Sequence, residues 1–363
     1  MKNILVIFGG QSIEHDVSVI TGVLTCNSLK EKYNPLPVLV DKNGEWWSGK
    51  NLRDIDFYKE INYKKLKRVA LLPFGRKLYE TKRKKVREIA SISAVINCIH
   101  GERGEDGSLA GLLKMSGIPL VSPSILASSV CMDKRATKIF LKGLNIPTLP
   151  SEEITTIEEA EKAIKRIGFP VIVKPIHGGS SIGVNSASDY KGLTTAVYSA
   201  LKFDRRVLIE PRLLNFTEIN EACYLSKDGI VFSQLEAPLG SGEILDFDDK
   251  YSFGKRIFPL KVKKEIEAKI TRYTKRIYSA LDMTGVIRID YFVKEDKVFV
   301  NEINTVPGSL AYYLFSEKTS DFSKMLEEMI EVAISRSSSE ETLTREFSSG
   351  ILSISGTKGC KCL

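Results

Sequence analysis

Apolar and polar positions follow two periods along the chain, one typical of buried strands and one typical of helices. Residues 4–8 form a continuous apolar run, as expected of a strand that is buried on both faces of a parallel sheet. Gly9-Gly10 ends this run, and residues 17–24 place apolar side chains at helical spacing. Apolar runs at 37–40 and 94–99 predict further strands. Strands that alternate with helices predict a parallel α/β region in the first third of the chain.

Polar loops that contain glycine follow two of these predicted strands. Glu14 lies in the loop after residues 4–8, and His100 opens the loop after residues 94–99. In parallel sheets, ligands bind at the carboxyl ends of the strands. We therefore expect Glu14 and His100 to face one crevice.

The rest of the chain predicts further α/β structure. Residues 122–124 (Ser-Pro-Ser) mark a boundary between two domains. An amphipathic helix is expected at 157–167. A long helix is expected at 262–281, and strands are expected at 171–174, 207–210, 219–225, 230–235, 286–293 and 298–304. After about residue 335 the chain becomes rich in Ser and Glu, which indicates a tail.

A glycine- and serine-rich loop, residues 178–183, lies between two predicted strands and follows Lys174. The amides of such loops bind phosphate oxygens, and serine hydroxyls add donors. The loop has neither the P-loop pattern nor the dinucleotide-binding fingerprint. Taken alone, it fits a flexible turn as well as it fits a phosphate site.

The predicted hairpin at 286–304 places charged side chains on one face. Arg288 and Asp290 share a face of the first strand, and Glu302 and Asn304 share a face of the second. A connecting loop of odd length would place Asp290 opposite Glu302 and Arg288 opposite Asn304. Opposed carboxylates repel each other, and a bound cation removes the conflict. These oxygen ligands suit Mg²⁺; the alternative is an acidic hairpin that faces solvent.

Composition limits the class of protein. The 363 residues are 43% hydrophobic and 27% charged, which excludes wholesale disorder, collagen and coiled coil. No apolar run approaches the ~18 residues that a membrane helix needs, so no membrane span is expected. The six cysteines are scattered without a C-x-x-C spacing, which favours reduced thiols in a cytoplasmic protein.

The charge balance allows two classes of partner. The chain has 53 Lys and Arg against 45 Asp and Glu, a net charge of +8, which suits nucleic acid or a polyphosphate ligand. The lysine-rich patches at 64–68 and 82–85 have no interleaved aromatic residues for base stacking. A solvated face is therefore favoured over a nucleic-acid site.

Six motifs occur in a fixed order along the chain. They are Gly9-Gly10-Gln11-Ser12-Ile13-Glu14-His15-Asp16-Val17-Ser18, His100-Gly101-x-x-Gly104-Glu105-Asp106-Gly107, Met132-Asp133-Lys134, Val173-Lys174-Pro175 with Gly179-Ser180-Ser181-x-Gly183, Asp249-Lys250-Tyr251, and Arg288-Ile289-Asp290 with Asn301-Glu302-Ile303-Asn304-Thr305-x-Pro307-Gly308. Together they closely resemble the D-alanine–D-alanine ligase family of ATP-grasp enzymes, over roughly residues 1–335. Each motif alone is weak, and their joint occurrence makes the resemblance specific.

The resemblance implies an α/β protein with the ATP-grasp fold, built of three α/β domains, the first with a parallel sheet (the pre-ATP-grasp domain). The expected bounds are 1–123 for the N-terminal α/β substrate domain, 124–211 for the central ATP-grasp subdomain, 212–335 for the C-terminal ATP-grasp subdomain with the metal site, and 336–363 for a C-terminal tail. It also implies that nucleotide lies between two antiparallel sheets.

The implied reaction is the ATP-dependent ligation of two D-alanines to the dipeptide used in peptidoglycan synthesis. ATP phosphorylates the carboxylate of the first D-alanine. The amine of the second attacks the acyl phosphate, and a tetrahedral intermediate loses phosphate. Two anions must approach in line, so their charge has to be neutralised by cations and metal.

By the same resemblance, the cofactors are ATP and two Mg²⁺ (or Mn²⁺) ions. The residues implied in phosphate binding are Lys134, Lys174, Ser181 and Lys250. Adenine would be read by Glu210, Pro211 and Leu213, and the ribose by Glu218. The implied metal ligands are Asp290, Glu302 and Asn304.

The resemblance also implies the substrate contacts. Glu14 would hold the ammonium group of the first D-alanine, in a hydrogen-bonded set with Ser180 and Tyr251. His100 would lie near the first carboxylate. The oxyanion of the tetrahedral intermediate would be bound by Arg288 and the Gly308 amide, and the carboxylate of the second D-alanine by Ser309 and Leu310.

Several alternatives stay open at this point. A close relative would use D-serine or D-lactate as the second substrate, although Tyr251 after Lys250 resembles the dipeptide-forming type. A different class is a basic, non-catalytic, ATP-binding protein that binds nucleic acid, and the net charge motivates it. The favoured interpretation is a cytoplasmic homodimer that binds neither nucleic acid nor membrane.

Overall fold

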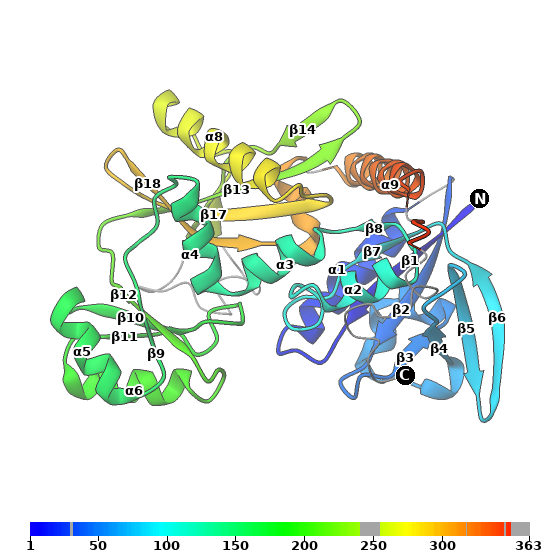
Figure 1. Ribbon diagram of the computed structural model, residues 1–363, viewed down its shortest axis with the longest axis horizontal. Helices are drawn as coiled ribbons and strands as arrows, with labels where there is room; N and C mark the ends of the chain where they lie inside the picture. Colours follow the sequence, from blue (N-terminus) through cyan, green and yellow to red (C-terminus); the bar gives the residue numbers. More distant parts are fainter. Residues whose placement is uncertain (30–31, 240–254, 317, 345, 350–363) are drawn as a thin grey trace.

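The computed structural model describes residues 1–29, 32–239, 255–316, 318–344 and 346–349. Within these ranges the chain forms an eight-stranded sheet, two four-stranded sheets and a two-stranded ribbon, with helices packed on them (Figure 1). The eight-stranded sheet lies at one end of the molecule and the two four-stranded sheets at the other. In this described part, no helix is long and apolar enough to cross a membrane.

The N-terminal sheet has the strand order β6-β5-β4-β3-β2-β1-β7-β8. Its parallel strands are β1 (Lys2–Gly9), β2 (Tyr33–Val40), β7 (Ala94–Asn97) and β8 (Leu120–Val121). Helices α1 (His15–Ser28) and α2 (Ser108–Met115) follow β1 and β7, as the alternating pattern predicts. Gly9 ends β1 at φ +90°, where a Cβ atom would lie 2.3 Å from the carbonyl oxygen of Val40. The turn after β1 therefore requires glycine.

Four further strands extend this sheet in antiparallel order. They are β3 (Trp46–Ser48), β4 (Lys67–Leu71), β5 (Lys77–Lys82) and β6 (Lys85–Ser91). The short 3₁₀ helices η1 (Lys50–Arg53), η2 (Ile55–Lys59) and η3 (Tyr63–Lys65) connect β3 to β4. The hydrophobic pattern did not predict these strands, because many of their side chains are exposed and leave no continuous apolar run.

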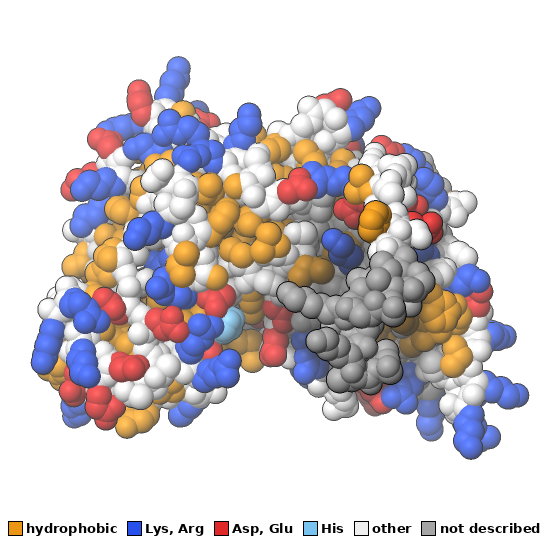
Figure 2. All heavy atoms as spheres, in the orientation of Figure 1, with side chains coloured by type: hydrophobic (Ala, Val, Ile, Leu, Met, Phe, Trp, Pro, Cys, Tyr) orange, Lys and Arg blue, Asp and Glu red, His pale blue; other side chains and the backbone are white. Residues whose placement is uncertain are grey.

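The lysine-rich patches at 64–68 and 82–85 lie in this antiparallel extension. Residues 82–85 form the turn between β5 and β6, and their side chains are exposed. Figure 2 shows Lys and Arg side chains spread over the visible face and mixed with Asp and Glu, rather than gathered into one basic field. This distribution supports the interpretation of the patches as solvated surface.

The central sheet is antiparallel, with the strand order β11-β10-β12-β9. Its strands are β9 (Glu152–Ile154), β10 (Val171–Pro175), β11 (Asn185–Ala187) and β12 (Val207–Pro211). Helices α5 (Ile157–Ile167) and α6 (Tyr190–Ala200) cover one face of it (Figure 1). The side chain of Thr156 caps α5 by accepting a hydrogen bond from the Glu159 amide, as expected for an N-cap threonine.

The C-terminal sheet is also antiparallel, with the strand order β14-β13-β17-β18. Its strands are β13 (Thr217–Ser226), β14 (Gly229–Phe232), β17 (Val286–Lys294) and β18 (Lys297–Asn304). The helices of this region are α3 (Ile125–Met132), α4 (Lys134–Gly143), α8 (Lys264–Ala280), the 3₁₀ segment η4 (Gly308–Leu314) and α9 (Thr319–Glu341). The ribbon of β15 (Ala237–Leu239) and β16 (Lys255–Ile257) lies beside β13.

The hydrophobic cores divide the chain differently from the expected bounds. Helices α3 and α4 were expected in the central subdomain, at 124–211, but Ala127 and Leu141 share a core with Ile219 and Ile287 of the C-terminal sheet. The core of the central sheet is made of residues between 154 and 209. The sheet on which α3 and α4 pack is decided by tertiary contacts that the sequence pattern does not show.

The C-terminal helix α9 packs against the N-terminal sheet. Phe322 and Met325 of α9 belong to the same core as Ile4 and Phe8 of β1. The helix runs to Glu341, so the boundary expected at residue 335 falls inside it. The described part of the predicted tail is therefore partly helical.

A buried carboxyl group lies in the core between β13 and α8. Glu221 is 1% exposed and accepts a hydrogen bond of 2.6 Å from Thr271 Oγ1. Burial raises the pKa of Glu221 to about 7, although the threonine hydroxyls oppose this shift. A raised pKa in the folded state means that folding favours the protonated form. Folding stability is then retained at low pH and is lost as the pH rises from about 4.5 to about 7.

We expect Glu221→Gln to remove this pH-dependent loss. Relative to the wild type, the variant should gain stability as the pH rises from 5 to 8, by up to about 3 kcal/mol for a shift of this size. Thermal melts at four pH values in that range measure the difference, with Glu265→Gln, an exposed position on the neighbouring helix α8, as control. A difference in melting temperature that is independent of pH would contradict an ionisation at Glu221.

Candidate active site

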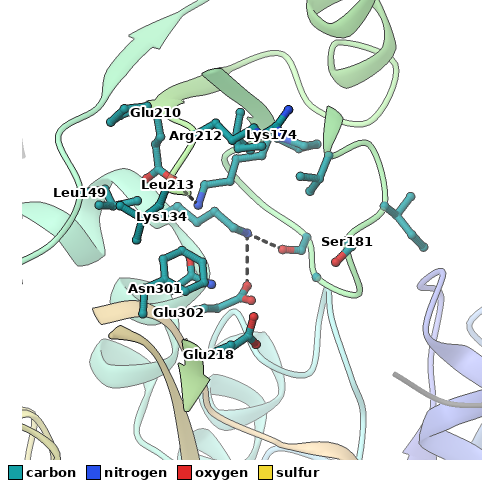
Figure 3. Close-up of a pocket in the computed structure, with 18 of the residues that line it drawn as sticks. Lys134, Leu149, Lys174, Ser181, Glu210, Arg212, Leu213, Glu218, Asn301 and Glu302 are labelled. Carbon is teal, nitrogen blue, oxygen red and sulfur yellow. Dashed lines mark hydrogen bonds and ion pairs between the residues drawn. The ribbon is translucent and has the colours of Figure 1, made fainter. Parts of the chain in front are cut away.

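A pocket of about 330 Å³ lies between the central and the C-terminal sheets (Figure 3). Its size is typical of a small-molecule site. The residues expected to bind nucleotide that line it are Lys134, Lys174, Ser181, Glu210, Pro211, Leu213 and Glu218. Ile172 and Phe292 supply apolar walls from the two facing sheets. The lining of the pocket therefore combines apolar walls with cationic groups.

A buried carboxylate lies between two lysines in this pocket. Glu210 on β12 is 3% exposed, and its two carboxylate oxygens lie 2.6 Å from Lys138 Nζ and 2.7 Å from Lys174 Nζ. Burial would raise the pKa of Glu210, but the two lysines outweigh burial and lower it. The cluster has one more positive than negative charge, which favours an anionic ligand. Lys138 was missed by sequence reasoning, because its place on α4 beside the pocket depends on tertiary packing.

Lys134 joins the glycine-serine loop to the C-terminal sheet. It opens α4, and its Nζ donates a hydrogen bond of 2.6 Å to the Gly178 carbonyl and lies 3.4 Å from Glu302 Oε1 (Figure 3). The loop connects β10 to the short antiparallel strand β11, whereas the next strand expected after the loop was 207–210. Ser180 and Ser181 adopt left-handed backbone conformations, with φ of 55° and 59°. The loop is therefore a defined turn that is held from both sides of the pocket.

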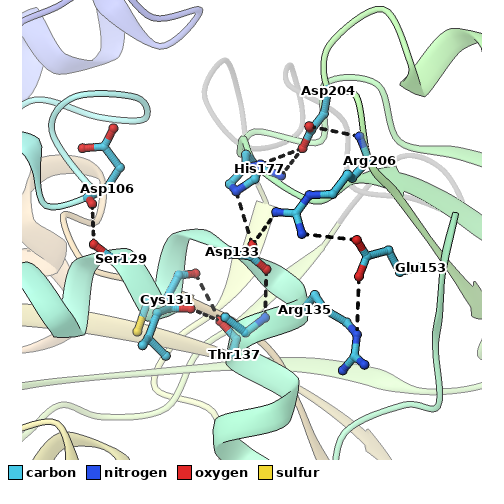
Figure 4. Close-up of polar contacts among 12 residues, drawn as sticks. Asp106, Ser129, Cys131, Asp133, Arg135, Thr137, Glu153, His177, Asp204 and Arg206 are labelled. Atoms are coloured by element: carbon cyan, nitrogen blue, oxygen red, sulfur yellow. Dashed lines mark hydrogen bonds and ion pairs between the residues drawn. The ribbon is translucent and has the colours of Figure 1, made fainter. Parts of the chain in front are cut away.

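A cluster of charged residues fixes the start of this loop (Figure 4). His177 Nδ1 lies 2.8 Å from Asp204 Oδ2, and its Nε2 lies 3.4 Å from Asp133 Oδ2. Arg206 donates to the same Asp133 oxygen at 2.7 Å. Asp133 also caps α4 by accepting a hydrogen bond from the Ala136 amide. Through His177, the loop is tied to the first turn of the helix that begins with Lys134.

The hairpin of β17 and β18 has the predicted cross-strand pairs. Asp290 pairs with Glu302 and Arg288 with Asn304. The register is reached by a different route, however, because Lys294 pairs with Lys297 across a two-residue turn. A β-bulge after Asp290 then inserts one extra residue, Asn301, and this shifts the pairing by one.

The two opposed carboxylates each have a cationic partner. Arg288 donates to both oxygens of Asp290, from Nε at 2.7 Å and from Nη2 at 3.0 Å. Lys134 lies beside Glu302, and Asn304 Nδ2 donates to Asp290 Oδ2 at 3.1 Å. Their mutual repulsion is therefore offset within the protein, and it does not by itself require a metal ion.

The donor set nevertheless fits a divalent cation. Asp290, Glu302 and Asn304 offer oxygen atoms on one face of the hairpin, and Glu302 lines the pocket. Among the residues that the structure describes, no group of three or more His, Cys, Asp and Glu side chains could hold a metal. Two carboxylates and an amide oxygen, with waters and phosphate oxygens, are typical of Mg²⁺ beside a nucleotide.

Glu14 and the glycine-serine loop meet across the molecule. Glu14 is 7% exposed and lies at the start of α1, and Ser180 Oγ donates a hydrogen bond to Glu14 Oε1. A Cβ atom on Gly179 would lie 3.3 Å from the same carboxylate oxygen. The hydrogen bond expected between Glu14 and Ser180 is therefore present, and it joins the N-terminal sheet to the loop that lines the pocket.

His100 is buried, at 4% exposure, in the same crevice. Its Nε2 lies 2.9 Å from Thr21 Oγ1, and a second hydrogen bond joins the ring to the main chain of Val306. Burial lowers the pKa of His100 to about 4, the Val306 hydrogen bond opposes the shift, and the Arg288 charge adds to it. The imidazole is therefore neutral at physiological pH. A direct bond from His100 to a substrate would have to displace one of these two partners.

The segment after Pro307 forms a left-handed turn. Ser309, Leu310 and Ala311 have φ angles of 51°, 51° and 49°. A left-handed turn of non-glycine residues costs roughly 1–2 kcal/mol per residue. The Leu310 and Ala311 side chains are buried in the core shared with the N-terminal sheet, and the Ser309 amide donates to Thr21 Oγ1 at 3.0 Å. Tertiary contacts therefore hold this turn, and backbone strain of this kind is common at functional sites.

Glu105 links the two segments that surround His100. Its Oε2 accepts a hydrogen bond of 2.8 Å from the Gly101 amide, and its Oε1 accepts one of 2.8 Å from the Val306 amide. Burial and the nearby Glu14 charge raise the pKa of Glu105. Glu105 belongs to the second motif, but its contact with Val306 spans about two hundred residues and could not be read from the motif.

Two of the expected site residues, Lys250 and Tyr251, lie outside the described residues. The Glu14–Ser180 part of the expected Glu–Ser–Tyr set is in place, and Tyr251 stays a prediction. The loop glycine Gly308 begins η4, directly before the left-handed turn.

The two facing sheets with a lysine-lined pocket between them define an ATP-grasp enzyme. The family model described as D-ala D-ala ligase N-terminus matches residues 3–123, and the one described as D-ala D-ala ligase C-terminus matches residues 140–331. The chain belongs to the D-alanine–D-alanine ligase family.

Curated relatives and solved structures agree with this family. The chain is 34% identical to the D-alanine–D-alanine ligase of Thermosipho melanesiensis over 93% of this chain and 94% of that protein. It is 33% identical to that of Clostridium acetobutylicum over 92% and 98%. The crystal structure of the enzyme from Helicobacter pylori matches with a TM-score of 0.78 at 31% identity over 91% and 98%. The VanG D-Ala:D-Ser ligase of Enterococcus faecalis matches with a TM-score of 0.77 at 26% identity over 92% and 99%.

Proposed function

We propose that this protein joins two D-alanines to D-alanyl-D-alanine for peptidoglycan synthesis, with cleavage of ATP to ADP and phosphate. One observation supports this most directly. Ser180 of the loop that lines the nucleotide-sized pocket is hydrogen-bonded to Glu14 of the N-terminal crevice. A carboxylate that can hold an amino-acid ammonium group therefore lies beside a loop that can hold phosphate, as an acyl-phosphate reaction requires.

The nucleotide would occupy the pocket between the sheets. Lys134, Lys174, Ser181 and the loop amides would contact the phosphates, with Lys250 on the γ-phosphate. Glu210, Pro211 and Leu213 would contact the adenine edge, and Glu218 the ribose. A ligand would have to share Glu210 with its two lysines, because both oxygens already contact them.

Asp290, Glu302 and Asn304 would hold two Mg²⁺ or Mn²⁺ ions. When bound, these ions neutralise phosphate charge and so reduce the repulsion between two anions. The protein's own cations contribute in the same direction. Arg288 lies on the face of β17 that carries Asp290, and Lys134 lies beside Glu302.

The amino acids would bind on the side of the N-terminal crevice. Glu14 would hold the first ammonium group and Ser180 would orient Glu14, with Tyr251 as the third member. His100 would lie near the first carboxylate as a neutral group. Arg288 and the Gly308 amide would stabilise the oxyanion, and Ser309 and Leu310 would contact the carboxylate of the second D-alanine.

A second candidate function is ligation of D-serine or D-lactate in the second position. The structural likeness to the VanG D-Ala:D-Ser ligase keeps the D-serine alternative open, because that chain shares the fold to the same extent as the D-alanine–D-alanine ligase of Helicobacter pylori. The left-handed turn Ser309–Ala311 is the segment in which such a difference would lie, since it is the proposed contact of the second substrate. The cytoplasmic location and the homodimer are further expectations from the family, and sedimentation of the purified protein tests the second.

Mass spectrometry of the reaction products tests the proposal. The protein is incubated with ATP, Mg²⁺ and a panel of D-alanine, D-serine and D-lactate, with L-alanine as control. We expect D-alanyl-D-alanine and ADP in equal amounts, and no product from L-alanine. ATP cleavage that does not depend on D-alanine would contradict the proposal. So would duplex binding with a steep salt dependence, which would favour a nucleic-acid protein.

A further inference from the structure

We propose that Thr21 is a positioning residue that holds the left-handed turn Ser309–Ala311 in place and links it to His100. This inference rests on the proposed function, in which the turn binds the second D-alanine and His100 lies near the first. Thr21 itself need not touch either substrate.

Thr21 lies where three distant parts of the chain meet. It is on α1, is 1% exposed, and its Oγ1 is 3.0 Å from the Ser309 amide nitrogen and 2.9 Å from His100 Nε2. Ser309 is 288 residues away in the sequence and His100 is 79 residues away. A single hydroxyl group therefore contacts both segments that the proposed function assigns to substrates.

The hydrogen atoms at this junction can be assigned. The Ser309 N–H can only donate, so Thr21 Oγ1 accepts from it. The hydrogen bond between His100 and the Val306 main chain favours the protonated ring, so a ring N–H donates to a carbonyl oxygen there. A neutral imidazole has one N–H, and its Nε2 is then an acceptor for the Thr21 hydroxyl proton. Val17 O, at 3.2 Å from Thr21 Oγ1, is the longer alternative acceptor.

This junction acts on a strained segment. Three consecutive non-glycine residues of the turn have left-handed φ angles, and relaxation toward ordinary backbone angles would move the groups that they present. The Thr21 hydroxyl anchors the first of these residues, and the buried side chains of Leu310 and Ala311 anchor the other two. Loss of the hydroxyl would leave the Ser309 amide without its acceptor and release one end of the turn.

Helix α1 also fixes the spacing between the two substrate regions. Glu14 is at the N-cap of α1, and Thr21 follows two turns later, which corresponds to about 10 Å along a helix axis. The residue proposed to hold the first D-alanine and the residue that holds the second-substrate turn are therefore on one rigid element.

The test compares Thr21→Val with Thr21→Ser. Valine keeps the shape and removes the hydroxyl, whereas serine keeps the hydroxyl and removes a methyl group. The control is Thr25→Val, one turn further along α1, where the side chain is also buried and its Oγ1 contacts Cys98 Sγ at 3.6 Å. Initial rates are fitted with separate Michaelis constants for ATP and for the first and second D-alanine, and melting temperatures are recorded.

We expect Thr21→Val to raise the Michaelis constant for the second D-alanine by about 10- to 100-fold, as displacement of a positioned group by less than 1 Å can do. The constant for ATP should not change, and Thr21→Ser should restore most of the loss. Thr25→Val should lower the melting temperature without changing the kinetics.

Two results would overturn the inference. One is wild-type kinetics in Thr21→Val, and the other is equal kinetic loss in Thr21→Val and Thr25→Val, which would indicate a purely structural role. Absence of dipeptide formation by the wild-type protein is a different outcome, since it would contradict the proposed function itself.

Discussion

Replacing Glu302 by glutamine or Asp290 by asparagine is expected to reduce dipeptide formation by roughly 10³-fold or more, because metal binding supplies several kcal/mol of charge stabilisation. Both carboxylates lie on one face of the hairpin beside the pocket. Each substitution keeps the side-chain shape and removes one negative charge from the proposed metal site.

The two variants should differ in folding stability. Asp290 is 2% exposed and forms a two-pronged pair with Arg288, so Asp290→Asn removes the charge partner of a partly buried cation. Glu302 contacts Lys134 at 3.4 Å in a more open position, so Glu302→Gln should fold almost like the wild type. Glu302→Gln is therefore the cleaner test of the metal site.

The measurement is kcat as a function of Mg²⁺ concentration, together with the melting temperature. Asp296→Asn is the matched control, because this carboxylate is on the exposed turn of the same hairpin and pairs with Lys263. Turnover of Glu302→Gln at the wild-type rate and at ordinary Mg²⁺ concentrations would contradict the assignment of the metal ligands.

Arg288→Ala is expected to lower kcat by 10²–10³-fold, about 3 kcal/mol, with a small change in ATP affinity. The guanidinium keeps its charge at any physiological pH and offers a planar fork of donors. Its effect should be largest in the transition state, where the oxyanion develops. Arg288→Lys should rescue only part of the rate, because an ammonium group lacks this fork.

The alternative role for Arg288 is to brace the hairpin. Its two hydrogen bonds to Asp290, and a longer one of 3.4 Å to Tyr313 OH, show that it does hold neighbouring groups in place. If bracing were its whole role, Arg288→Ala would lower the melting temperature and weaken Mg²⁺–ATP binding while kcat at saturation stayed unchanged. Measuring all three quantities on this variant separates the two roles.

The sequence was most informative where chemistry and periodicity coincide. The facing pairs Asp290–Glu302 and Arg288–Asn304 could be predicted, because residues of equal parity share a strand face. The bulge at Asn301 could not be predicted, because an inserted residue leaves no mark in the polar pattern. A connecting loop of odd length would give the same cross-strand pairs, because the extra residue of the second strand would then lie in the loop instead of in the bulge.

Contacts between distant segments were the least predictable part of the site. Thr21, Glu105 and Lys138 have ordinary local surroundings in the sequence, and their partners lie on other elements. The four strands β3–β6 were missed for a related reason, since half-exposed antiparallel strands lack a continuous apolar run. In contrast, the hairpin could be located from its paired carboxylates at strand spacing, and the glycine-serine loop was favoured as a phosphate site only because the motifs around it resemble those of one family.

The distribution of the hydrophobic cores has a mechanical consequence. One core joins the first strand of the chain to its last long helix, so these parts move as a single body. The core of the central sheet is self-contained between residues 154 and 209, and the pocket separates it from the C-terminal sheet. A rotation of the central sheet relative to the rest of the protein would therefore disrupt neither core. The polar contacts of Lys134 and Ser180 across the gap are formed in this structure, and such a rotation would have to break them.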